Sequence, residues 1–527
     1  MAGFAEKMRR LKDFLFGKEK YPSNNAVDII KSPSDQRSTE TEHKAFRSSL
    51  EQTEKPTSTT KTDKSIFEVG RQKDEPSNER DPYFFQIGFD FGTAFSKCIC
   101  RDVNTSEAWV YVSPRFSGNK MECLYPSLLK YENKTLSYID EYDRHYADGN
   151  LYHLKWALRE VASSQWDAQT LNVYRQALER QDNRKLAQFV EVCSIYYLAG
   201  VLGEIRADLI TRFNDYGNHP NDLIAVNLGI PVAFAEEPKV RDLYHGVLCK
   251  AWWLSNKLSG HPYIKYDELK NLCDHNNSQP DSAIQDVCFL VPEVSANLQG
   301  FVKSRVSKPG IYLFSDTGAA TVDQCIFTFT RRNFEEGLNY LHADVIPLGS
   351  SQIEFIAASM KTDDCNAKCS LLEKWRKLKE KGADEYELKS ACSQIAEKLS
   401  SQTLKILASS RRKLYNHNQL EDVDIIFGGG GHCDNPYKEA VLYPFSYPTI
   451  FNKPINPNII GIPKPTDLTL NNQQEAWLPR LSVAYGLSFN RFDLADNLFP
   501  HQIDNPKEEE IWQPIATRHS APTKDEC

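Results

Sequence analysis

Hydrophobic residues are distributed in two different ways along the chain. Between residues 83 and 499, short apolar runs alternate with long amphipathic stretches, the pattern of an α/β protein. From residue 19 to residue 82, apolar residues are sparse and Ser, Thr, Lys, Glu, Asp and Pro dominate. Such a stretch buries too little surface to offset its conformational entropy. The pattern therefore predicts a compact body that is preceded by a long disordered linker.

The first 18 residues differ from this linker. Phe4, Met8, Leu11 and Leu15 recur at helical spacing, and basic residues occupy many of the positions between them. The spacing predicts a basic amphipathic helix over 1–18, which either binds a membrane surface or a partner, or folds back onto the protein itself. Residues 500–527 return to a polar composition and are expected to form a flexible tail.

Composition narrows the class of protein. The 63 basic residues are outnumbered by 71 acidic ones, so there is no overall attraction to nucleic acid, and no nucleic-acid partner is expected. No run of about 18 apolar residues stands out as a membrane-spanning helix. The 13 cysteines are scattered, which suits reduced thiols better than a disulfide framework. We therefore expect a cytoplasmic protein, at most peripheral at the inner membrane face.

An internal repeat carries the candidate chemistry. Residues 87–94 (IGFDFGTA) are echoed by residues 313–320 (LFSDTGAA), and in each an apolar strand delivers an aspartate, Asp90 or Asp316, into a glycine turn. Glycine lets the backbone approach a ligand closely, amides and hydroxyls bind phosphate oxygens, and a carboxylate holds magnesium or its waters. A third apolar strand, from Asp424, runs into four glycines at 428–431 that could lie flat against a nucleoside.

As an ordered set, these segments resemble the nucleotide-binding motifs of the actin-like ATPase superfamily, which contains actin, sugar kinases and DnaK-type heat-shock chaperones. Residues 90–93 resemble the first phosphate loop, 316–323 the second and 427–436 the adenosine loop. Residues 291–296 and 481–486 are similar to connecting motifs of the chaperones.

The resemblance implies an α/β fold with two similar ribonuclease-H-like lobes around a nucleotide cleft. Lobe I would span 83–305 and lobe II would span 306–476, and a return segment to lobe I would follow at 477–499.

The resemblance also implies roles for the matched residues. Asp90 and Asp316 would face magnesium through water, and Asp323 would support the magnesium shell. Catalytic roles would fall to Asp316, Glu293 and a lysine, either Lys155, which is preferred, or Lys97. Binding of ATP or ADP would involve Gly92, Thr93, Ala94, Gly318, Ala319, Ala320, Thr321, Gly429, Gly430 and Gly431, and a charged helix would add Glu373, Arg376 and Lys377.

Some positions depart from the chaperone pattern. Ala319 and Ala320 replace glycines of the second loop, and Ala94 replaces a threonine of the first, which puts the rate of hydrolysis in doubt more than binding. The expected function is a magnesium-dependent, ATP-hydrolysing, chaperone-like nucleotide switch. It would act through an unidentified protein partner or client, because no peptide-binding domain is expected after Leu498. The alternatives are a filament-forming ATPase of the bacterial actin kind, a small-molecule kinase, and a pseudo-ATPase that binds nucleotide without turnover.

Overall fold

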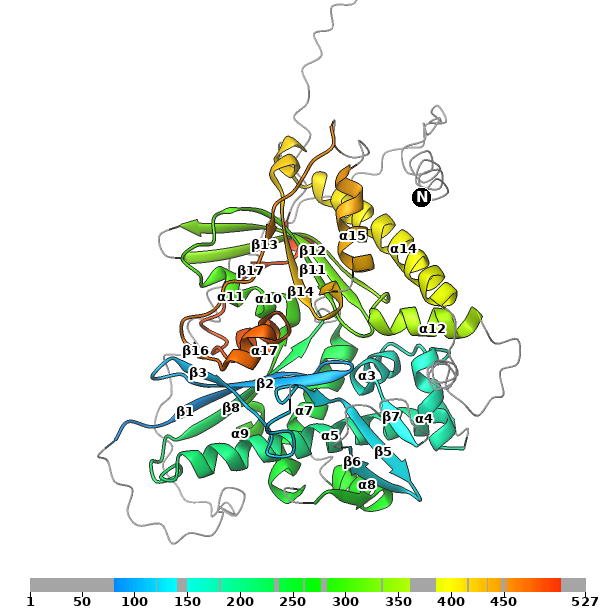
Figure 1. Cartoon of the computed structure of the whole chain (residues 1–527). Coiled ribbons are helices and arrows are strands. Elements are labelled where there is room, and N and C mark those ends of the chain that lie inside the picture. The colour runs from blue at the N-terminus through cyan, green and yellow to red at the C-terminus, as the bar shows by residue number, and fades with distance from the viewer. Residues whose placement is uncertain are drawn as a thin grey trace, which may run out of the picture. The chain divides into compact units, whose positions relative to one another are not determined.

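The computed structural model divides the chain into two units, Met1–Ser77 and Asn78–Cys527. It describes residues of the second unit only, namely 80–119, 121–139, 149–179, 182–231, 237–258, 261–275, 282–332, 335–360, 385–414, 417–433, 435–446, 451 and 453–503. The amphipathic helix predicted for 1–18 and almost all of the linker lie outside the described residues, as does most of the predicted tail. The expected α/β class is confirmed (Figure 1).

The first large sheet has seven strands and contains the first half of the sequence repeat. Its main path runs in the order β10, β8, β1, β2, β3, β16, and β4 pairs with β2. The strands are β1 (Phe84–Asp90), β2 (Phe95–Asp102), β3 (Glu107–Val110), β4 (Tyr125–Pro126), β8 (Leu223–Ile230), β10 (Cys288–Pro292) and β16 (Leu468–Thr469).

The second large sheet has six strands and contains the second half of the repeat. Its order is β15, β14, β11, β12, β13, β17. The strands are β11 (Gly310–Thr317), β12 (Val322–Arg332), β13 (Glu335–Ile346), β14 (Asp424–Gly429), β15 (Ile459–Ile460) and β17 (Asp496–Leu498). A smaller sheet consists of β5 (Leu128–Glu132), β6 (Thr135–Tyr138), β7 (Asn150–Tyr152) and β9 (Tyr263–Lys265).

The two large sheets share strand order and direction around their central strands. In the first, β1 is antiparallel to β2 and parallel to β8, and β2 continues antiparallel to β3 while β8 continues parallel to β10. In the second, β11 relates to β12, β13, β14 and β15 in the same way. The two halves of the sequence repeat therefore occupy equivalent hairpins, β1–β2 and β11–β12.

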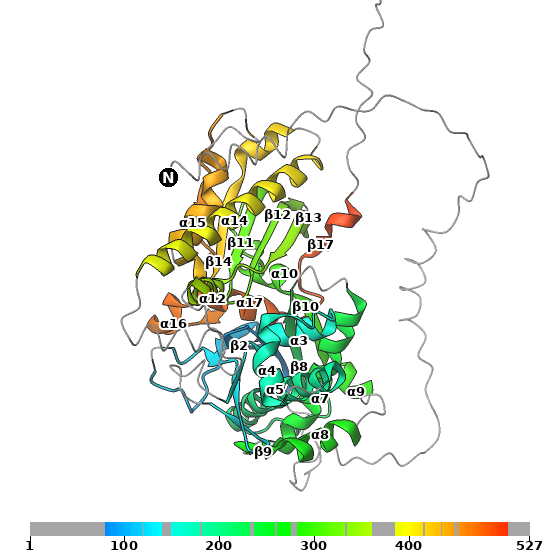
Figure 2. The ribbon, with the colours of Figure 1, turned by 90° about the vertical axis from the view of Figure 1, so that its right-hand side faces the viewer.

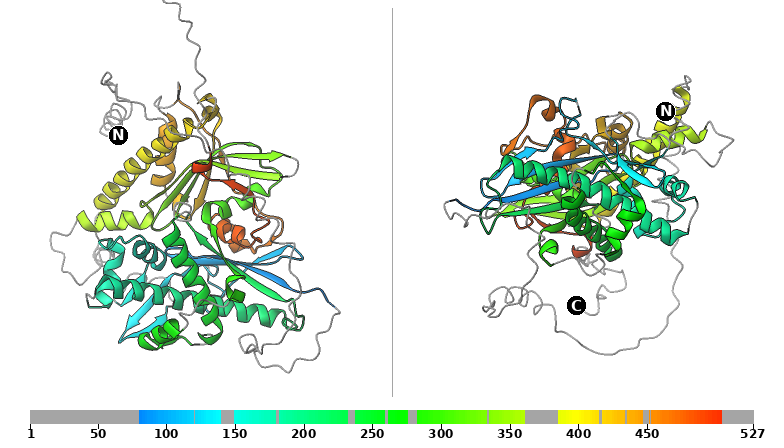
Figure 3. Two further views of the ribbon diagram at one scale, coloured as in Figure 1. Left: turned by 180° about the vertical axis from the view of Figure 1, so that it is seen from behind. Right: turned by 90° about the horizontal axis from the view of Figure 1, so that it is seen from below.

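Helices cover the outer faces of these sheets. The first is covered by helices that include α3 (Leu154–Ala162), α5 (Asn183–Arg212) and α7 (Pro238–Leu258), which Figure 3 shows from below on the right. Against the second lies α14 (Glu385–Arg411), and α12 (Ser350–Met360) packs on α14, as Figure 2 shows. Further helices are α4 (Asn172–Ala177), α8 (Tyr266–His275), α9 (Ser282–Gln285), α15 (Asn435–Leu442) and α16 (Asn472–Ala476).

Helix α5 is apolar enough to resemble a membrane span. Its length and mean hydropathy pass that test, but 83% of its apolar window is buried inside the protein. The sequence expectation that no segment is apolar enough overlooked this helix. Its buried side chains belong to one hydrophobic core with those of β1 and α7, so its hydrophobicity is that of a core helix.

Three short helices lie between the two sheets (Figure 1). They are α10 (Glu293–Asn297), α11 (Gln299–Val302) and α17 (Leu478–Leu487). Helices α10 and α17 touch through their backbones, because a Cβ at Gly486 would lie 1.8 Å from the carbonyl oxygen of Ala296. Helix α17 also lies directly on β1, where a Cβ at Gly88 would lie 2.3 Å from the carbonyl oxygen of Ala484.

The C-terminal strands connect both sheets. Strand β16 already pairs with β3 of the first sheet, before residue 477, where the return segment was expected to begin. Strand β17 pairs with β13 of the second sheet, although residues 477–499 were assigned to lobe I. Only α17 and its flanks within that range lie against the first sheet. This difference arises because a two- or three-residue edge strand leaves almost no periodic signal in the sequence.

We predict that Gly88→Ala destabilises the protein strongly. The added methyl group would meet the backbone of α17 at Ala484 and Ser488, which cannot move aside as a flexible side chain can. The expected loss is about 3 kcal/mol or more of unfolding free energy. The matched control is Gly246→Ala in α7, where a Cβ meets nothing within 4 Å and alanine should stabilise the helix by about 0.5 kcal/mol. Thermal and denaturant unfolding measure the effect of each substitution. Equal changes in unfolding free energy for the two variants would contradict the close contact between α17 and β1.

Candidate functional site

A cavity of about 260 Å³ lies between the two large sheets. The predicted residues that line it are Asp90, Gly92, Thr93, Ala94, Lys97, Lys155, Glu293, Asp316, Gly318, Ala319, Thr321, Asp323, Gly429, Gly430 and Gly431. Ala320 is buried beside it but does not line it. Glu373, Arg376 and Lys377 lie outside the described residues. Folding thus brings together residues more than 300 positions apart in the sequence.

The first predicted loop connects β1 and β2. Asp90, the last residue of β1, is directly opposite Lys97 on β2, and Lys97 Nζ lies 2.5 Å from Asp90 Oδ2. The turn is tight: the Gly92 amide donates to the carbonyl oxygen of Asp90 at 2.9 Å, and a Cβ at Gly92 would lie 2.0 Å from the carbonyl oxygen of Phe95. Glycine is therefore required here, and the loop backbone is left open to the cavity.

The second predicted loop connects β11 and β12 in the equivalent way. Here the residue opposite Asp316 is Asp323, so two carboxylates occupy the positions of the aspartate and the lysine in the first hairpin. The start of α12 holds the loop by a hydrogen bond, in which the Ser350 amide donates to the carbonyl oxygen of Gly318 at 3.0 Å. A Cβ at Gly349 would lie 2.4 Å from the carbonyl oxygen of Ala319, so α12 meets the loop backbone to backbone.

The glycine cluster lies beside this second loop. Gly429 has a φ of 74°, and a Cβ there would lie 2.1 Å from Asp316 Oδ1. Gly429 therefore provides both the left-handed backbone and the space that the Asp316 carboxylate occupies. At the next position, a Cβ on Gly430 would lie 2.4 Å from Nε of Arg480, a residue of α17. The glycines thus make room for the side chains of Asp316 and Arg480.

A buried ion pair forms another wall of the cavity. Lys155 Nζ donates to Glu293 Oε1; Lys155 is the second residue of α3 and Glu293 the first of α10. Gly229 on β8 makes room for the pair, since a Cβ there would lie 2.8 Å from Glu293 Cγ. Both lysine candidates, Lys97 and Lys155, therefore line the cavity, and each holds a carboxylate.

The electrostatics of the cavity are set by burial. Loss of solvent raises the pKa of Asp316 to about 7, with Asp90 and Glu293 adding to the rise while Lys97 and Lys155 oppose it. Burial also raises the pKa of Asp323 well above its usual range, and Glu293 and Asp316 raise it further. Burial raises the pKa of Glu293 despite Lys155. The carboxylates of the second hairpin therefore hold protons readily when no cation is bound.

These residues suit a hydrated cation better than a directly ligated one. Among the described residues, no three His, Cys, Asp or Glu side chains are placed to ligate a metal together. Asp323 Oδ1 is nevertheless buried without a hydrogen-bond partner, and such an atom needs a donor or a cation. Magnesium keeps several of its waters when it binds near phosphates, so Asp90, Asp316 and Asp323 could hold it through water.

Some residues of the site were missed by the sequence analysis. Asn297 Nδ2 donates to Asp316 Oδ2 at 2.6 Å and so fixes the orientation of that carboxylate, although Asn297 itself does not line the cavity. Thr317, Ser350 and Arg480 do line it. A usable signal existed for two of them, because Asn297 directly follows the connecting motif 291–296 and Arg480 directly precedes 481–486. Ser350 had none, since nothing in the sequence links it to the second loop.

Helix α12 makes a further contact across the protein, with the small sheet and the start of α3, at a place separate from α10 and α17. Phe355 of α12 packs in one cluster with Leu128 and Tyr152, which belong to the small sheet. Ser351 Oγ lies 3.5 Å from Nε2 of His153, a buried residue with a φ of 57° at the start of α3. These contacts join the segment that holds the second loop to the one that carries Lys155.

A scan against models of known protein families gave no match, and a search of curated proteins found no significantly similar sequence. The interpretation of the cavity therefore rests on its residues and their geometry.

We predict that Asp316→Asn stabilises the ligand-free protein more at pH 8 than at pH 5. The folded pKa of about 7 lies above the ordinary 3.8, so this carboxyl reduces stability progressively as pH rises from about 4 to 7. Asparagine does not ionise and avoids that loss. Thermal unfolding in EDTA checks this, with Asp424→Asn, a residue outside the cavity on β14, as the control. A mutant-minus-wild-type difference that is the same at both pH values would contradict the burial of Asp316.

Proposed function

We propose that this protein binds ATP with magnesium in the cavity between its two sheets, and that it is an actin-like ATPase with two ribonuclease-H-like lobes. The observation that carries the proposal is the equivalence of the hairpins β1–β2 and β11–β12. They occupy corresponding places in two sheets of the same strand order, and both of their glycine loops line one cavity together with a third glycine loop. This arrangement supports binding of a ligand with a phosphate chain and a flat nucleoside.

Each part of the cavity has a role in this proposal. The hydroxyls of Thr93 and Thr321 and the amides of their loops would donate to phosphate oxygens, and Gly429 to Gly431 would lie against the adenosine. Asp90, Asp316 and Asp323 would hold magnesium, which when bound spreads the negative charge of the phosphates.

The pair Lys155 and Glu293 would position water for hydrolysis. Glu293 Oε1 accepts a hydrogen bond from Lys155 Nζ, so its second oxygen can accept one from a water molecule in the cavity. Asn297 would keep Asp316 in place through the turnover. Since these groups are preorganised by buried contacts, the chain needs little rearrangement to orient a water beside the phosphates.

The biological role that follows is a nucleotide switch of the heat-shock chaperone kind. Ligand bound by both loops would hold the sheets together, and the surface presented to an unidentified partner or client would differ between bound and free states. A filament-forming ATPase would use the same cavity, so sedimentation of the full chain with ATP and magnesium distinguishes the two roles. If the protein pellets only with ATP at micromolar concentration, the filament-forming ATPase would be favoured over the nucleotide switch.

We predict that Asp316→Asn lowers the ATPase rate about 100-fold or more, the range expected when electrostatic stabilisation of phosphoryl transfer is lost. Its affinity for ADP should change far less, because the glycine loop that faces the adenosine is unaltered. Single-turnover hydrolysis and calorimetric ADP titration measure the two effects.

The control for this experiment is again Asp424→Asn, which removes a carboxylate outside the cavity. An unchanged rate in Asp316→Asn would refute the assigned site. A wild-type protein that binds ATP without hydrolysing it would instead support a pseudo-ATPase. The specific observation in favour of that alternative is Ala319, whose methyl group is in the wall of the cavity where the chaperone loop has glycine.

A further inference from the structure

The cavity contains a third cation, Arg480, to which the motifs assign no role. It belongs to the first turn of α17, and together with Pro479 and Val483 it forms the face of that helix that lines the cavity. The neighbouring Leu481 and Ala484 instead pack into the core against the first sheet. The spacing of Arg480 and Val483 by three residues puts both on one helix face, so α17 presents this side chain to the cavity by its register.

The guanidinium of Arg480 is held in a defined place. Its central carbon lies 4.7 Å from the centroid of the Trp477 ring, and the guanidinium also lies next to Gly430. Any side chain at Gly430 would meet it, since a Cβ there would lie 2.4 to 2.6 Å from Nε, Cζ and Nη2. The absence of a side chain in the glycine loop thus creates the slot in which the guanidinium lies.

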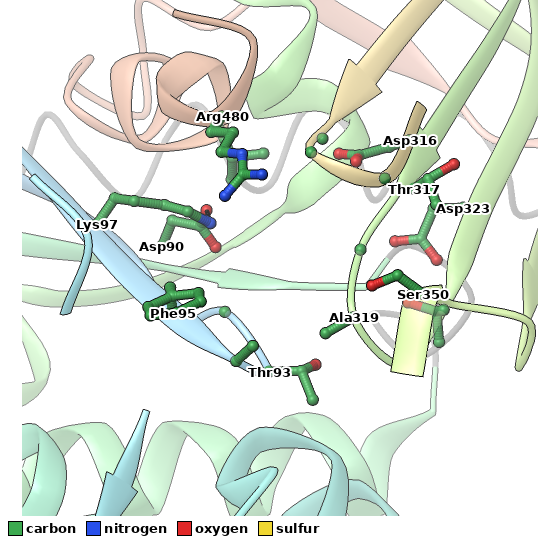
Figure 4. A pocket seen from close by; sticks show the side chains of 18 of the residues that line it. Asp90, Thr93, Phe95, Lys97, Asp316, Thr317, Ala319, Asp323, Ser350 and Arg480 are labelled. Carbon is green, nitrogen blue, oxygen red and sulfur yellow. Dashed lines mark hydrogen bonds and ion pairs between the residues drawn. The ribbon is translucent and has the colours of Figure 1, made fainter. Parts of the chain in front are cut away.

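The position of this slot suggests what Arg480 binds. Figure 4 shows the guanidinium pointing into the cavity between the Asp90–Lys97 pair and Asp316. The guanidinium therefore lies against Gly430 of the glycine loop, where the nucleoside would bind, and points into the space between the two hairpins, where the phosphates would bind. An arginine beside the glycine loop is placed to contact the phosphate groups closest to the nucleoside. Its planar guanidinium can donate two parallel hydrogen bonds to phosphate oxygens.

The charge of the cavity supports the same assignment. Four carboxylates (Asp90, Glu293, Asp316, Asp323) and three cations (Lys97, Lys155, Arg480) line it. Without Arg480 the formal balance would fall from −1 to −2, which opposes the entry of a polyphosphate.

We propose that Arg480 is a specificity-determining residue that binds the phosphates common to ADP and ATP and so selects these nucleotides over adenosine. This inference rests on the proposed function and deepens it. A contact to phosphates near the nucleoside acts on ADP and ATP alike, in contrast to groups such as Asp316, whose expected effect is on turnover.

The test is calorimetric titration of the full chain with adenosine, ADP and ATP, in the presence of magnesium. We expect Arg480→Ala to weaken ADP and ATP by a similar factor of about 10 to 100, the range for a lost charge-assisted hydrogen bond. Adenosine affinity should change less than threefold. Arg480→Lys should recover part of the loss, because it restores the charge without the fork. The matched control is Arg491→Ala, an exposed arginine that stacks on Phe289 and Phe492 outside the cavity.

The outcomes separate the inference from the function on which it rests. A wild-type chain that binds neither ADP nor ATP would overturn both. A wild-type chain that binds them, with ADP affinity unchanged in Arg480→Ala, would overturn the inference alone. Equal losses of affinity for adenosine and ADP in Arg480→Ala would also overturn it, because Arg480 would then contact the nucleoside rather than the phosphates. Thermal unfolding of each ligand-free variant establishes that the losses do not come from misfolding.

Discussion

The enclosure of four carboxylates in one small cavity is the constraint on which the rest of this site depends. Carboxylates taken out of water favour the protonated form, and neighbouring negative charges strengthen that preference. Lys97 and Lys155 each hold one carboxylate, Asp90 and Glu293 respectively. Asp316 and Asp323 face each other on the second hairpin without a lysine between them. That half of the cavity is therefore the half most in need of a bound cation.

The asymmetry between the halves comes from one position in two otherwise equivalent hairpins. Strand register places residue 97 opposite Asp90 and residue 323 opposite Asp316, and these are a lysine and an aspartate. Directly opposed side chains on an antiparallel pair are close enough to interact strongly. The first hairpin is thus neutral within itself, whereas the second carries two acids. A hydrated cation with phosphate ligands would satisfy the second hairpin and bridge it to the first.

The sequence predicted the parts of the site that are contiguous and missed those assembled by folding. The repeat at Asp90 and Asp316 was visible because a strand, an aspartate and a glycine turn follow one another directly, and the structure puts both in one cavity. Arg480 lines it and Asn297 holds Asp316, both from helices between the sheets, so their contacts depend on packing that no local pattern encodes. Helix α5 was overlooked for a different reason: its apolarity is visible in the sequence, but whether it belongs to a core helix is decided by the burial of 83% of its apolar window.

The contact between α10 and α17 has a mechanical consequence. Their backbones touch at Ala296 and Gly486, so the two helices can turn about this point but cannot slide past it without separating. Glu293 precedes the contact by three residues and Arg480 by six, which places them about 4.5 Å and about 9 Å along their helices from the pivot. Glu293 and Arg480 therefore lie within about two turns of the contact, on regular helical segments. A change in the angle between the two helices would therefore change the separation of Glu293 and Arg480, which both line the cavity.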